Sequence, residues 1–402
     1  MIRRRNKKPL IIVMVVLALT GLGVGYAMIR SSNTTSDDAA LSSSDDGSET
    51  ENTAEDTTLR LVATGDMIAH DSLIANAKTA TGSYDFLALM NEMKPYFEQA
   101  DARFCNQATP AGGEQFGISG YPVFNAPLEF NAGIADVGCN VINLGTNHTN
   151  DKGQSLINAM VADWQSRDVL ATAGANRSQA EREDISYFES KGIRFAFLSY
   201  STYTNDPSSN SYGLVMYDAA TAQAEIAKAK ANADFVLVSM RWGEEYSDSV
   251  SAAQDRVAQS VVDAGADFVF GHGPHVLQSV KKITAAGGSE ATVWYSLGNF
   301  LNTQIPVEAL VGGFAVMDID IASKTLQDIS FLPVYTHYDW TADEAARQDL
   351  LARDNVQMQV LDKSADLLAR SQLDTTVEAQ TERVREVLNR YTTVDILSSE
   401  QY

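Results

Sequence analysis

Residues 59–66 read Leu-Arg-Leu-Val-Ala-Thr-Gly-Asp. The apolar run over 59–64 predicts a β-strand, and Gly65-Asp66 ends it. In α/β sheets, ligands bind at the carboxyl ends of the strands. Asp66 is therefore the first candidate for a binding site, and the same pattern of an apolar run followed by polar residues recurs along the chain.

From Leu59 onward, short apolar runs alternate with amphipathic stretches. This alternation predicts an α/β domain, and a few later strands without a helix between them predict a partly antiparallel or mixed sheet. Apolar residues at helical spacing predict a helix over 84–98. Further helices are expected near 153–167 and 221–231, and the apolar positions within 342–395 predict helix throughout that segment. Further strands are expected near 102–105, 141–144, 194–200, 234–240, 267–270, 292–297 and 313–321.

The composition of the 402-residue chain excludes several classes of protein. It has 30 Lys and Arg against 52 Asp and Glu, a formal net charge of −22, so we expect no nucleic-acid partner. Hydrophobic residues make up 45%, which excludes a disordered protein. Two Cys are too few for a disulfide framework. Cys105 and Cys139 adjoin strands that we expect to be neighbours, and they form either a disulfide or two buried thiols.

The first thirty residues predict a membrane segment. Residues 9–29 contain no charge and, as a helix of roughly 30 Å, match the hydrocarbon core of a bilayer. Five cations precede this segment within residues 1–8 and only Arg30 follows closely, so the positive-inside rule places residues 1–8 in the cytoplasm. We expect an uncleaved single-pass signal anchor in the cell membrane and an extracellular main domain. A cleaved signal peptide is the alternative.

Residues 30–58 predict a disordered linker that is rich in Ser, Thr and acids. Positions 31–58 contain eight acids and no base, whereas the first thirty residues contain six bases and no acid. The net charge of −22 therefore leaves −20 on the chain from Leu59 onward. The exported domain is itself acidic, which favours solubility at a cell surface.

Four of the five His residues follow the end of a predicted strand. They lie in segments 65–70, 145–151 and 271–275, which also bring Asp and Asn onto loops. Oxygen and imidazole ligands together suit Zn, Mn or Fe, and a metal held in this way can activate water for attack on phosphorus. The alternative for each His is an ordinary surface or hydrogen-bonding role.

Six short blocks occur in order over roughly residues 60–335. They are Gly65-Asp66, Asn106-Gln107-Ala108-Thr109-Pro110, Asn147-His148 with Asp151 and Gly153, Trp242-Gly243 with Glu245 and Tyr246, Pro274-His275-Val276, and Tyr295-Ser296-Leu297-Gly298-Asn299-Phe300. In these blocks the chain resembles the bacterial capsule-synthesis CapA family, the poly-γ-glutamate biosynthesis proteins. The resemblance implies a four-layer α/β/β/α sandwich over 59–340, similar to calcineurin-like metallophosphatases. Residues 341–402 lie beyond it, and we expect a helical extension that packs on it.

The resemblance also implies a metal site at the strand ends. Asp66 would ligate a metal, Asn147 would be the amide ligand, and His275 the last imidazole ligand. His148, with Asp151 in the same block, would be placed as a general acid for the leaving group. The alternative for Asn147-His148 is a turn that hydrogen-bonds its own backbone. The pocket is expected to include His70, Asn106, Arg241, Glu245 and Asn299.

Three expected ligand positions depart from the family. Ala108 stands where the family has an acid, Arg241 where it has a His before Trp-Gly, and Gly273 where it has the first His of His-Pro-His. His272 lies one position earlier, where the family is variable, and is a weak candidate ligand. Ala and Gly have no side-chain donor and Arg stays protonated, so a divalent metal (Mn, Zn or Fe) should bind poorly.

Arg241 suggests a replacement for the metal. Its guanidinium would lie near Asp66 and Glu245 and neutralise the leftover carboxylate, because an unpaired buried acid is costly. This hypothesis requires Arg241 to lie within hydrogen-bond distance of an acid in the pocket. The alternative is that Arg241 points to solvent.

The expected function is capsule or exopolymer biosynthesis of the poly-γ-glutamate type, in polymer assembly, transport or attachment. The partners would be the membrane and the capsule polymer or its synthase complex. An active metal-dependent phosphoesterase or related hydrolase is the alternative, and a purely structural surface protein is a third interpretation. A domain of charge −20 repels a polyanion at long range, so any contact needs a local basic spot. Candidates for that spot are Arg241, Lys281 and Lys282.

Overall fold

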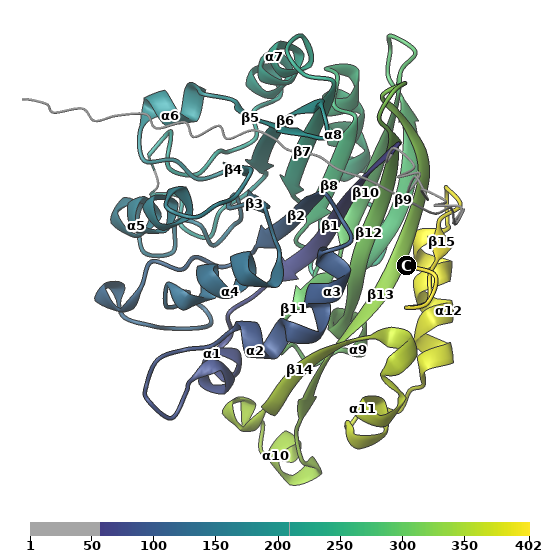
Figure 1. Ribbon diagram of the computed structural model, residues 1–402. Coiled ribbons are helices and arrows are strands. Elements are labelled where there is room, and N and C mark those ends of the chain that lie inside the picture. Colours follow the sequence, from purple (N-terminus) through teal and green to yellow (C-terminus); the bar gives the residue numbers. More distant parts are fainter. Residues whose placement is uncertain (1–56, 209) are drawn as a thin grey trace, which may run out of the picture. The chain divides into compact units, whose positions relative to one another are not determined.

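Two β-sheets form the centre of the part of the chain that the computed structural model describes, residues 57–208 and 210–402 (Figure 1). The predicted basic tail and membrane helix lie outside the described residues, and so does the acidic linker apart from its last two positions. Within these two ranges, no helix is long and apolar enough to cross a membrane. The membrane anchor therefore stays a prediction.

The first sheet is mixed and is built around β1 (Thr58–Met67). On one side of β1, the strands β2, β3 and β4 run parallel to it, and on the other side β12, β13 and β14 are antiparallel to their neighbours. The short β11 (Asn299–Leu301) pairs with β1, and β15 (Asp395–Ile396) pairs with β13. The order is β14 (Asp354–Val360), β13 (Thr325–Asp339), β12 (Val311–Asp320), β1, β2 (Ala102–Gln107), β3 (Val141–Asn143), β4 (Ala171–Ala173).

The second sheet has a parallel centre and antiparallel edges. Phe235 and Leu237 face the core shared with the first sheet, whereas Val236 and Val238 face a separate core under helices. Successive side chains of a strand point to opposite faces, so this strand is buried on both sides. The order is β5 (Ser186–Ser190), β6 (Ile193–Ser201), β7 (Phe235–Arg241), β8 (Phe268–His272), β10 (Glu290–Leu297), β9 (Leu277–Thr284).

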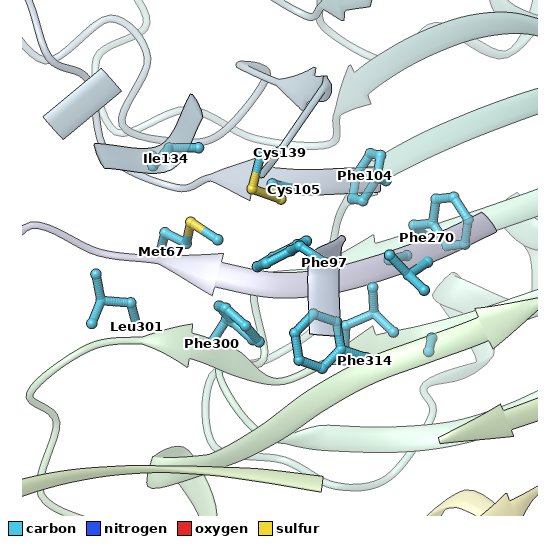
Figure 2. Close-up of a cluster of buried hydrophobic side chains, with 14 of the residues drawn as sticks. Met67, Phe97, Phe104, Cys105, Ile134, Cys139, Phe270, Phe300, Leu301 and Phe314 are labelled. Carbon is cyan, nitrogen blue, oxygen red and sulfur yellow. A yellow bond between two sulfur atoms is a disulfide. The ribbon is translucent and has the colours of Figure 1, made fainter. Parts of the chain in front are cut away.

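The two sheets pack face to face through aromatic side chains. The ring of Phe104 in β2 lies 5.7 Å from that of Phe197 and 4.8 Å from that of Phe270, measured between centroids, and both partners belong to the second sheet. Figure 2 shows part of this cluster. The predicted α/β class with mixed sheets is therefore confirmed.

Helices cover the outer face of each sheet (Figure 1). Trp164 of α5 is buried in the core of the first sheet, where its indole Nε1 donates to Gln107 Oε1 over 2.7 Å. Ile226 of α7 and Val261 of α8 belong to the core beneath the second sheet. The layers thus follow one another as helices, sheet, sheet, helices. The main covering helices are α4 (Glu129–Val137), α5 (Gln154–Gln165), α7 (Ala219–Lys230) and α8 (Ala252–Asp263).

Two predicted helical segments are corrected by the structure. Positions 84–98 form three short pieces, α2 (Leu87–Met90), η1 (Asn91–Met93) and α3 (Lys94–Phe97), because Pro95 lacks an N–H and starts a new helix. Positions 342–395 are not helical throughout, since β14 extends the first sheet there. Val356, Met358 and Val360 are buried at alternate positions of β14, which is strand periodicity.

The remaining C-terminal elements are short helices. They are α10 (Ala342–Ala346), η3 (Leu350–Ala352), η4 (Leu361–Lys363), α11 (Ala365–Arg370) and α12 (Val377–Leu388). Smaller elements elsewhere are α1 (Asp71–Ala77), η2 (Glu114–Phe116), α6 (Gln179–Glu183) and α9 (Val307–Leu310).

The two cysteines form a disulfide. Cys105 in β2 and Cys139, just before β3, are both buried, and their Cα atoms lie 5.9 Å apart (Figure 2). Of the two alternatives open from the sequence, the structure has the bond and not the two thiols. It links the strand that holds Asn106 to the connection entering β3.

Candidate functional site

Four neighbouring strands place four polar residues in a row at one edge of the first sheet. Asp66 of β1 is in register with Asn106 of β2 on one side and with Asn299 of β11 on the other. Asn106 is in turn in register with Asn143 of β3. All four side chains are buried. The sequence singled out three of them and missed Asn143, although a polar residue that ends the apolar strand Val-Ile-Asn was an available signal.

Gly65 is needed because β1 passes close to Gly298. A Cβ atom at position 65 would lie 2.1 Å from the carbonyl oxygen of Gly298, where no side chain fits. The next residue uses this approach, since Asp66 N donates to the same carbonyl over 2.9 Å. The Gly-Asp pair therefore fixes the position of the Asp66 carboxylate.

A chain of hydrogen bonds reaches Asp66 from the second sheet. Ser199 Oγ of β6 donates to Asn143 Oδ1 over 2.5 Å, and Asn143 Nδ2 donates to Asn106 Oδ1 over 2.7 Å. Asn106 Nδ2 then donates to Asp66 Oδ1 over 2.5 Å. Each buried amide is thus used as both donor and acceptor, which fixes its orientation and that of the carboxylate.

His275 is the charge partner of Asp66. Its Nδ1 lies 2.7 Å from Asp66 Oδ2 and 3.0 Å from Asn299 Oδ1. Burial alone would raise the pKa of Asp66, but the nearby imidazoles of His272 and His275 outweigh it and hold that pKa well below its usual range. The backbone of His275 is left-handed, with φ 61°, a conformation that is uncommon outside glycine and recurs at functional sites.

Two predicted site residues lie behind the pocket and do not line it. His272 is fully buried between the sheets, with its ring stacked on Phe104 at 5.5 Å and its Nδ1 3.5 Å from Asp66 Oδ1. Asn299 is buried too, and its amide donates to the carbonyl of Ala309 over 3.0 Å while its oxygen faces His275. Asn299 therefore contacts the His275 imidazole from below, whereas neither ring nitrogen of His272 has a hydrogen-bond partner among the described residues.

Arg241, the last residue of β7, is buried and bonds neutral groups. Its Nε donates to Asn147 Oδ1 over 2.7 Å, Nη1 donates to the carbonyl of Trp242 over 3.2 Å, and Nη2 donates to the hydroxyl of Tyr203. The acid that forms an ion pair with it is Glu245, at 3.8 Å from Nη2, and the Glu245 side chain is 51% exposed. Arg241 is only 2% exposed, so the alternative that it points to solvent is wrong.

The hypothesis that Arg241 neutralises Asp66 is also wrong. Its nearest described acid, Glu245, is beyond hydrogen-bond distance, and Asp66 is paired with His275 instead. The reason is geometric, since the carboxylate faces the imidazole that follows β8, whereas the guanidinium turns toward the amide of Asn147. Burial lowers the pKa of Arg241, but a guanidinium stays protonated in proteins. It is therefore a buried cation whose nearest described acid, the half-exposed Glu245, lies 3.8 Å away, while its hydrogen bonds go to neutral groups.

Gly273 makes room for this guanidinium. A Cβ atom at position 273 would lie 1.7 Å from Arg241 Nη1, and the φ of 111° at this residue disfavours any side chain. Two departures from the family, Arg241 and Gly273, are thus spatially coupled. The Arg241 guanidinium fills the space that a side chain at position 273 would need.

His148 and Asp151 form a pair at the side of the pocket. His148 Nδ1 lies 2.7 Å from Asp151 Oδ2, and that oxygen also accepts the backbone N–H of Phe124 over 2.8 Å. The segment is a turn, with Thr149 N donating to Thr146 O over 3.3 Å. The side chains of Asn147 and His148 nevertheless reach beyond this turn, so the turn alternative describes the backbone and not the side chains.

A cavity of about 680 Å³ opens above these residues. Its polar part is formed by predicted residues, and its apolar wall contains the buried cluster of Ile68, Ala108 and Phe124. Ala108, which stands where the family has an acid, is therefore part of an apolar surface. Arg353, which the sequence did not single out, also lines the cavity. The predicted residues that line it are Asp66, His70, Asn106, Asn147, His148, Arg241, Glu245 and His275.

His70 experiences the positive charge of this cavity. Burial, assisted by the positive charges of Arg353, His275 and His148, lowers the pKa of His70 to about 3. Its Nδ1 accepts the backbone N–H of Thr303 over 3.3 Å, which requires the neutral ring. His70 is therefore an uncharged wall residue at neutral pH.

The donors present do not fit the metal centre that the family resemblance implies. Asn147 Oδ1, the expected amide ligand, is occupied by the guanidinium of Arg241. Positions 108 and 273 have no side-chain donor. Among the residues that the structure describes, no three His, Cys, Asp or Glu side chains are grouped so that they could hold a metal ion.

Together these features define a layered α/β protein with a buried polar row and a buried cation in a pocket at the strand ends. The chain belongs to the family described as "Bacterial capsule synthesis protein PGA_cap", which matches residues 60–304, more than half of the chain. The family expected from the six sequence blocks is thereby confirmed.

Two relatives carry similar names. "Capsule biosynthesis protein CapA" of Bacillus anthracis is 32% identical over 179 residues, 42% of each chain. "PGA biosynthesis protein CapA" of Bacillus subtilis (strain 168) is 29% identical over 209 residues, 48% of this chain and 53% of the relative. The chain thus spans about half the length of the curated relatives it matches.

Among solved structures, a novel phosphatase of Mycoplasma pneumoniae has a TM-score of 0.43 at 12% identity, over 69% of this chain and 93% of its own. A similarity of this size carries no information about activity.

Proposed function

We propose that this chain is a cell-surface protein of capsule biosynthesis, held in the membrane by residues 9–29. In this proposal its cavity binds a segment of an anionic polymer of the poly-γ-glutamate type during assembly, transport or attachment. The names of the two relatives support capsule biosynthesis, and the name of the Bacillus subtilis relative, a PGA biosynthesis protein, supports the polymer class. The hydrophobic segment and the basic residues before it support the anchor. A disulfide is typical of compartments outside the cytoplasm, which supports an extracellular domain.

The observation that carries this proposal is the buried guanidinium of Arg241. All its partners within hydrogen-bond distance, among the described residues, are neutral. Removing a charge from water without an opposite charge costs several kcal/mol. A carboxylate from a ligand in the cavity would offset that cost through charge-assisted hydrogen bonds.

The other two candidate cations are already used. Lys281 Nζ lies 2.7 Å from Asp255 Oδ1, and Lys282 Nζ lies 3.3 Å from Glu290 Oε1. Neither residue lines the cavity. Because the domain carries a charge of −20, a polyanion needs a local cation, and in this proposal Arg241 supplies it, although Asp66, Asp71 and Glu245 line the same cavity.

The proposal is tested by titration calorimetry of the full-length chain with a short γ-linked glutamate oligomer. Arg241→Gln should weaken binding by roughly tenfold or more, as expected for a lost hydrogen bond to a charged group. Arg194→Gln is the matched control, because it removes the same charge from an exposed Arg at the amino end of β6, away from the cavity.

Two results would contradict the proposal. The first is the absence of binding to the wild-type chain, or binding that Arg241→Gln leaves unchanged in a folded variant. The second is a tightly held transition metal found by elemental analysis of the purified chain, because the donor set argues against one.

A metal-dependent hydrolase is the second candidate function, and the His148–Asp151 pair favours it. A buried Asp that holds one ring nitrogen orients a His for general acid–base work. A phosphoesterase assay with added Mn or Zn separates the two candidates. Activity that disappears both on chelation and in His148→Ala would favour the enzyme over the binding protein.

A further inference from the structure

Arg353 is a second buried cation of the same cavity. It lies between η3 and β14, is 6% exposed and lines the cavity that Arg241 also lines. Its Nε donates to the carbonyl of Leu350 over 2.7 Å, and Nη1 donates to the carbonyl of Thr303. No described carboxylate forms an ion pair with it. A guanidinium held in this way by neutral acceptors is positioned but not neutralised.

The wall around Arg353 is apolar and open to solvent. Ile305, Leu350 and Leu351 all line the cavity, with exposed fractions of 49%, 45% and 65%. Exposed side chains of this size gathered at one cavity mouth are typical of a surface that contacts a ligand. An aliphatic part of a ligand would cover them, and water would be released.

Asp71 lines the same cavity as Arg353 and lies near enough to attract it. The neutral ring of His70 lies in the same cavity, where Arg353 contributes to the field that keeps it unprotonated. Asp71, the acid whose attraction acts on Arg353, has an oxygen, Oδ1, that accepts the backbone N–H of Gly120 over 2.8 Å. Arg353 forms no ion pair with Asp71 or with any other described acid, so its guanidinium can still accept an anionic ligand group.

We propose that Arg353 forms a second anion subsite, so that the preferred ligand carries two carboxylates joined by an aliphatic spacer, one held at Arg241 and one at Arg353. This inference rests on the proposed function and deepens it, because it names the ligand class of the same cavity. The spacer would lie along Ile305, Leu350 and Leu351. Residues 350–353 lie beyond the family match at 60–304, so this part of the recognition comes from the C-terminal segment.

The test compares two ligands on the full-length chain by titration calorimetry. One is a γ-linked glutamate trimer with free carboxylates, and the other is the same trimer with all carboxylates but one converted to amides. The wild-type chain should bind the free trimer roughly tenfold or more tightly. Arg353→Gln should remove this preference and leave the affinity for the single-carboxylate ligand unchanged.

Arg347→Gln is the matched control. Arg347 follows α10, is exposed, and does not line the cavity, so this variant makes the same change in net charge six positions away. It should keep the preference for the free trimer. A purely structural role for Arg353 would lower the melting temperature without changing the ratio of the two affinities.

The outcomes separate the two proposals. Absence of binding of either ligand to the wild-type chain refutes the proposed function itself. Binding with the same trimer preference in Arg353→Gln as in the wild type overturns the second subsite alone. Should Arg353→Gln not fold, Leu351→Glu carries the test, because it adds a negative charge on an exposed side chain of the same wall. It should reduce the trimer preference, and an unchanged preference overturns the subsite.

Discussion

Gly273→Ala is the sharpest probe of the site, because it acts on the space that the Arg241 guanidinium fills. The added Cβ would lie 1.7 Å from Arg241 Nη1, so the methyl group and the guanidinium cannot keep their present positions together. The guanidinium must then move away from Asn147 Oδ1, its partner at 2.7 Å. The φ of 111° at position 273 adds backbone strain for any residue other than Gly.

Two contributions set the size of the effect. Backbone strain at a position that only glycine adopts readily costs about 1–3 kcal/mol. Loss of a buried hydrogen bond to a charged group costs about 1.5–3 kcal/mol more. The variant should therefore lose roughly 2.5–6 kcal/mol of unfolding free energy, a large part of the 5–15 kcal/mol typical of a folded domain.

A double-mutant cycle separates the two contributions. Urea unfolding of the full-length chain, followed by circular dichroism, would compare the wild type, Gly273→Ala, Arg241→Ala and the double variant. With the guanidinium removed, Gly273→Ala should cost the backbone strain only, so the coupling energy should be about 1.5–3 kcal/mol. Gly192→Ala is the control, since Gly192 also has positive φ but its added Cβ would meet no atom within 4 Å.

The reasoning fails if Gly273→Ala costs the same in both backgrounds. A coupling energy below about 0.5 kcal/mol is the value expected of independent sites. It would mean that the guanidinium does not occupy the space beside Gly273.

Three further predictions concern stability. The pKa of His70 is about 3 in the folded chain and about 6.5 when unfolded, so the unfolded chain binds the extra proton as the pH falls and folding weakens. As the pH falls from 6.5 to 4.5, His70 should lower the unfolding free energy by about 2–3 kcal/mol. In His70→Gln, the unfolding free energy from urea titrations should therefore depend less on pH over this range, and an unchanged dependence would count against the prediction. Cys105→Ser removes the disulfide to Cys139, which lies 34 residues away, and should lower the unfolding free energy by about 3–4 kcal/mol in urea unfolding. The reduced wild type is the control and should lose a similar amount. Asn143→Ala leaves Asn106 Oδ1 without its donor and should cost about 2–3 kcal/mol, whereas a loss below 0.5 kcal/mol would show that water replaces the amide.

Much of the fold was predictable because its signals are local. The strand at 59–64 and the helices near 153–167 and 221–231 follow from apolar spacing within one window, and all three occur in the structure. The helical prediction for 342–395 rests on apolar content alone and is wrong, because Val356, Met358 and Val360 alternate with the period of two that favours a strand.

The site was predictable only as a set of residues. Polar side chains at strand ends marked Asp66, Asn147 and His275, and these do line one cavity. The sequence also predicted His272 as a site residue, yet its side chain is buried in the core. Successive side chains of a strand point to opposite faces, so being at a strand end does not by itself place a residue in the cavity. Arg353 offered no sequence signal, since nothing in the order of residues shows that the C-terminal segment folds back onto this cavity.

Residue identity and short-range spacing are enough to indicate the family, the α/β class, the acidic character of the main domain and the loss of side-chain donors at Ala108 and Gly273. Three further features are visible only in the folded chain. Asp66 pairs with His275, Arg241 fills the space beside Gly273, and Arg353 adds a second cation. These contacts join residues that are far apart in the chain. The packing of the two sheets brings Asp66 and His275 together, the pairing of β7 with β8 brings Arg241 next to Gly273, and the C-terminal segment adds Arg353.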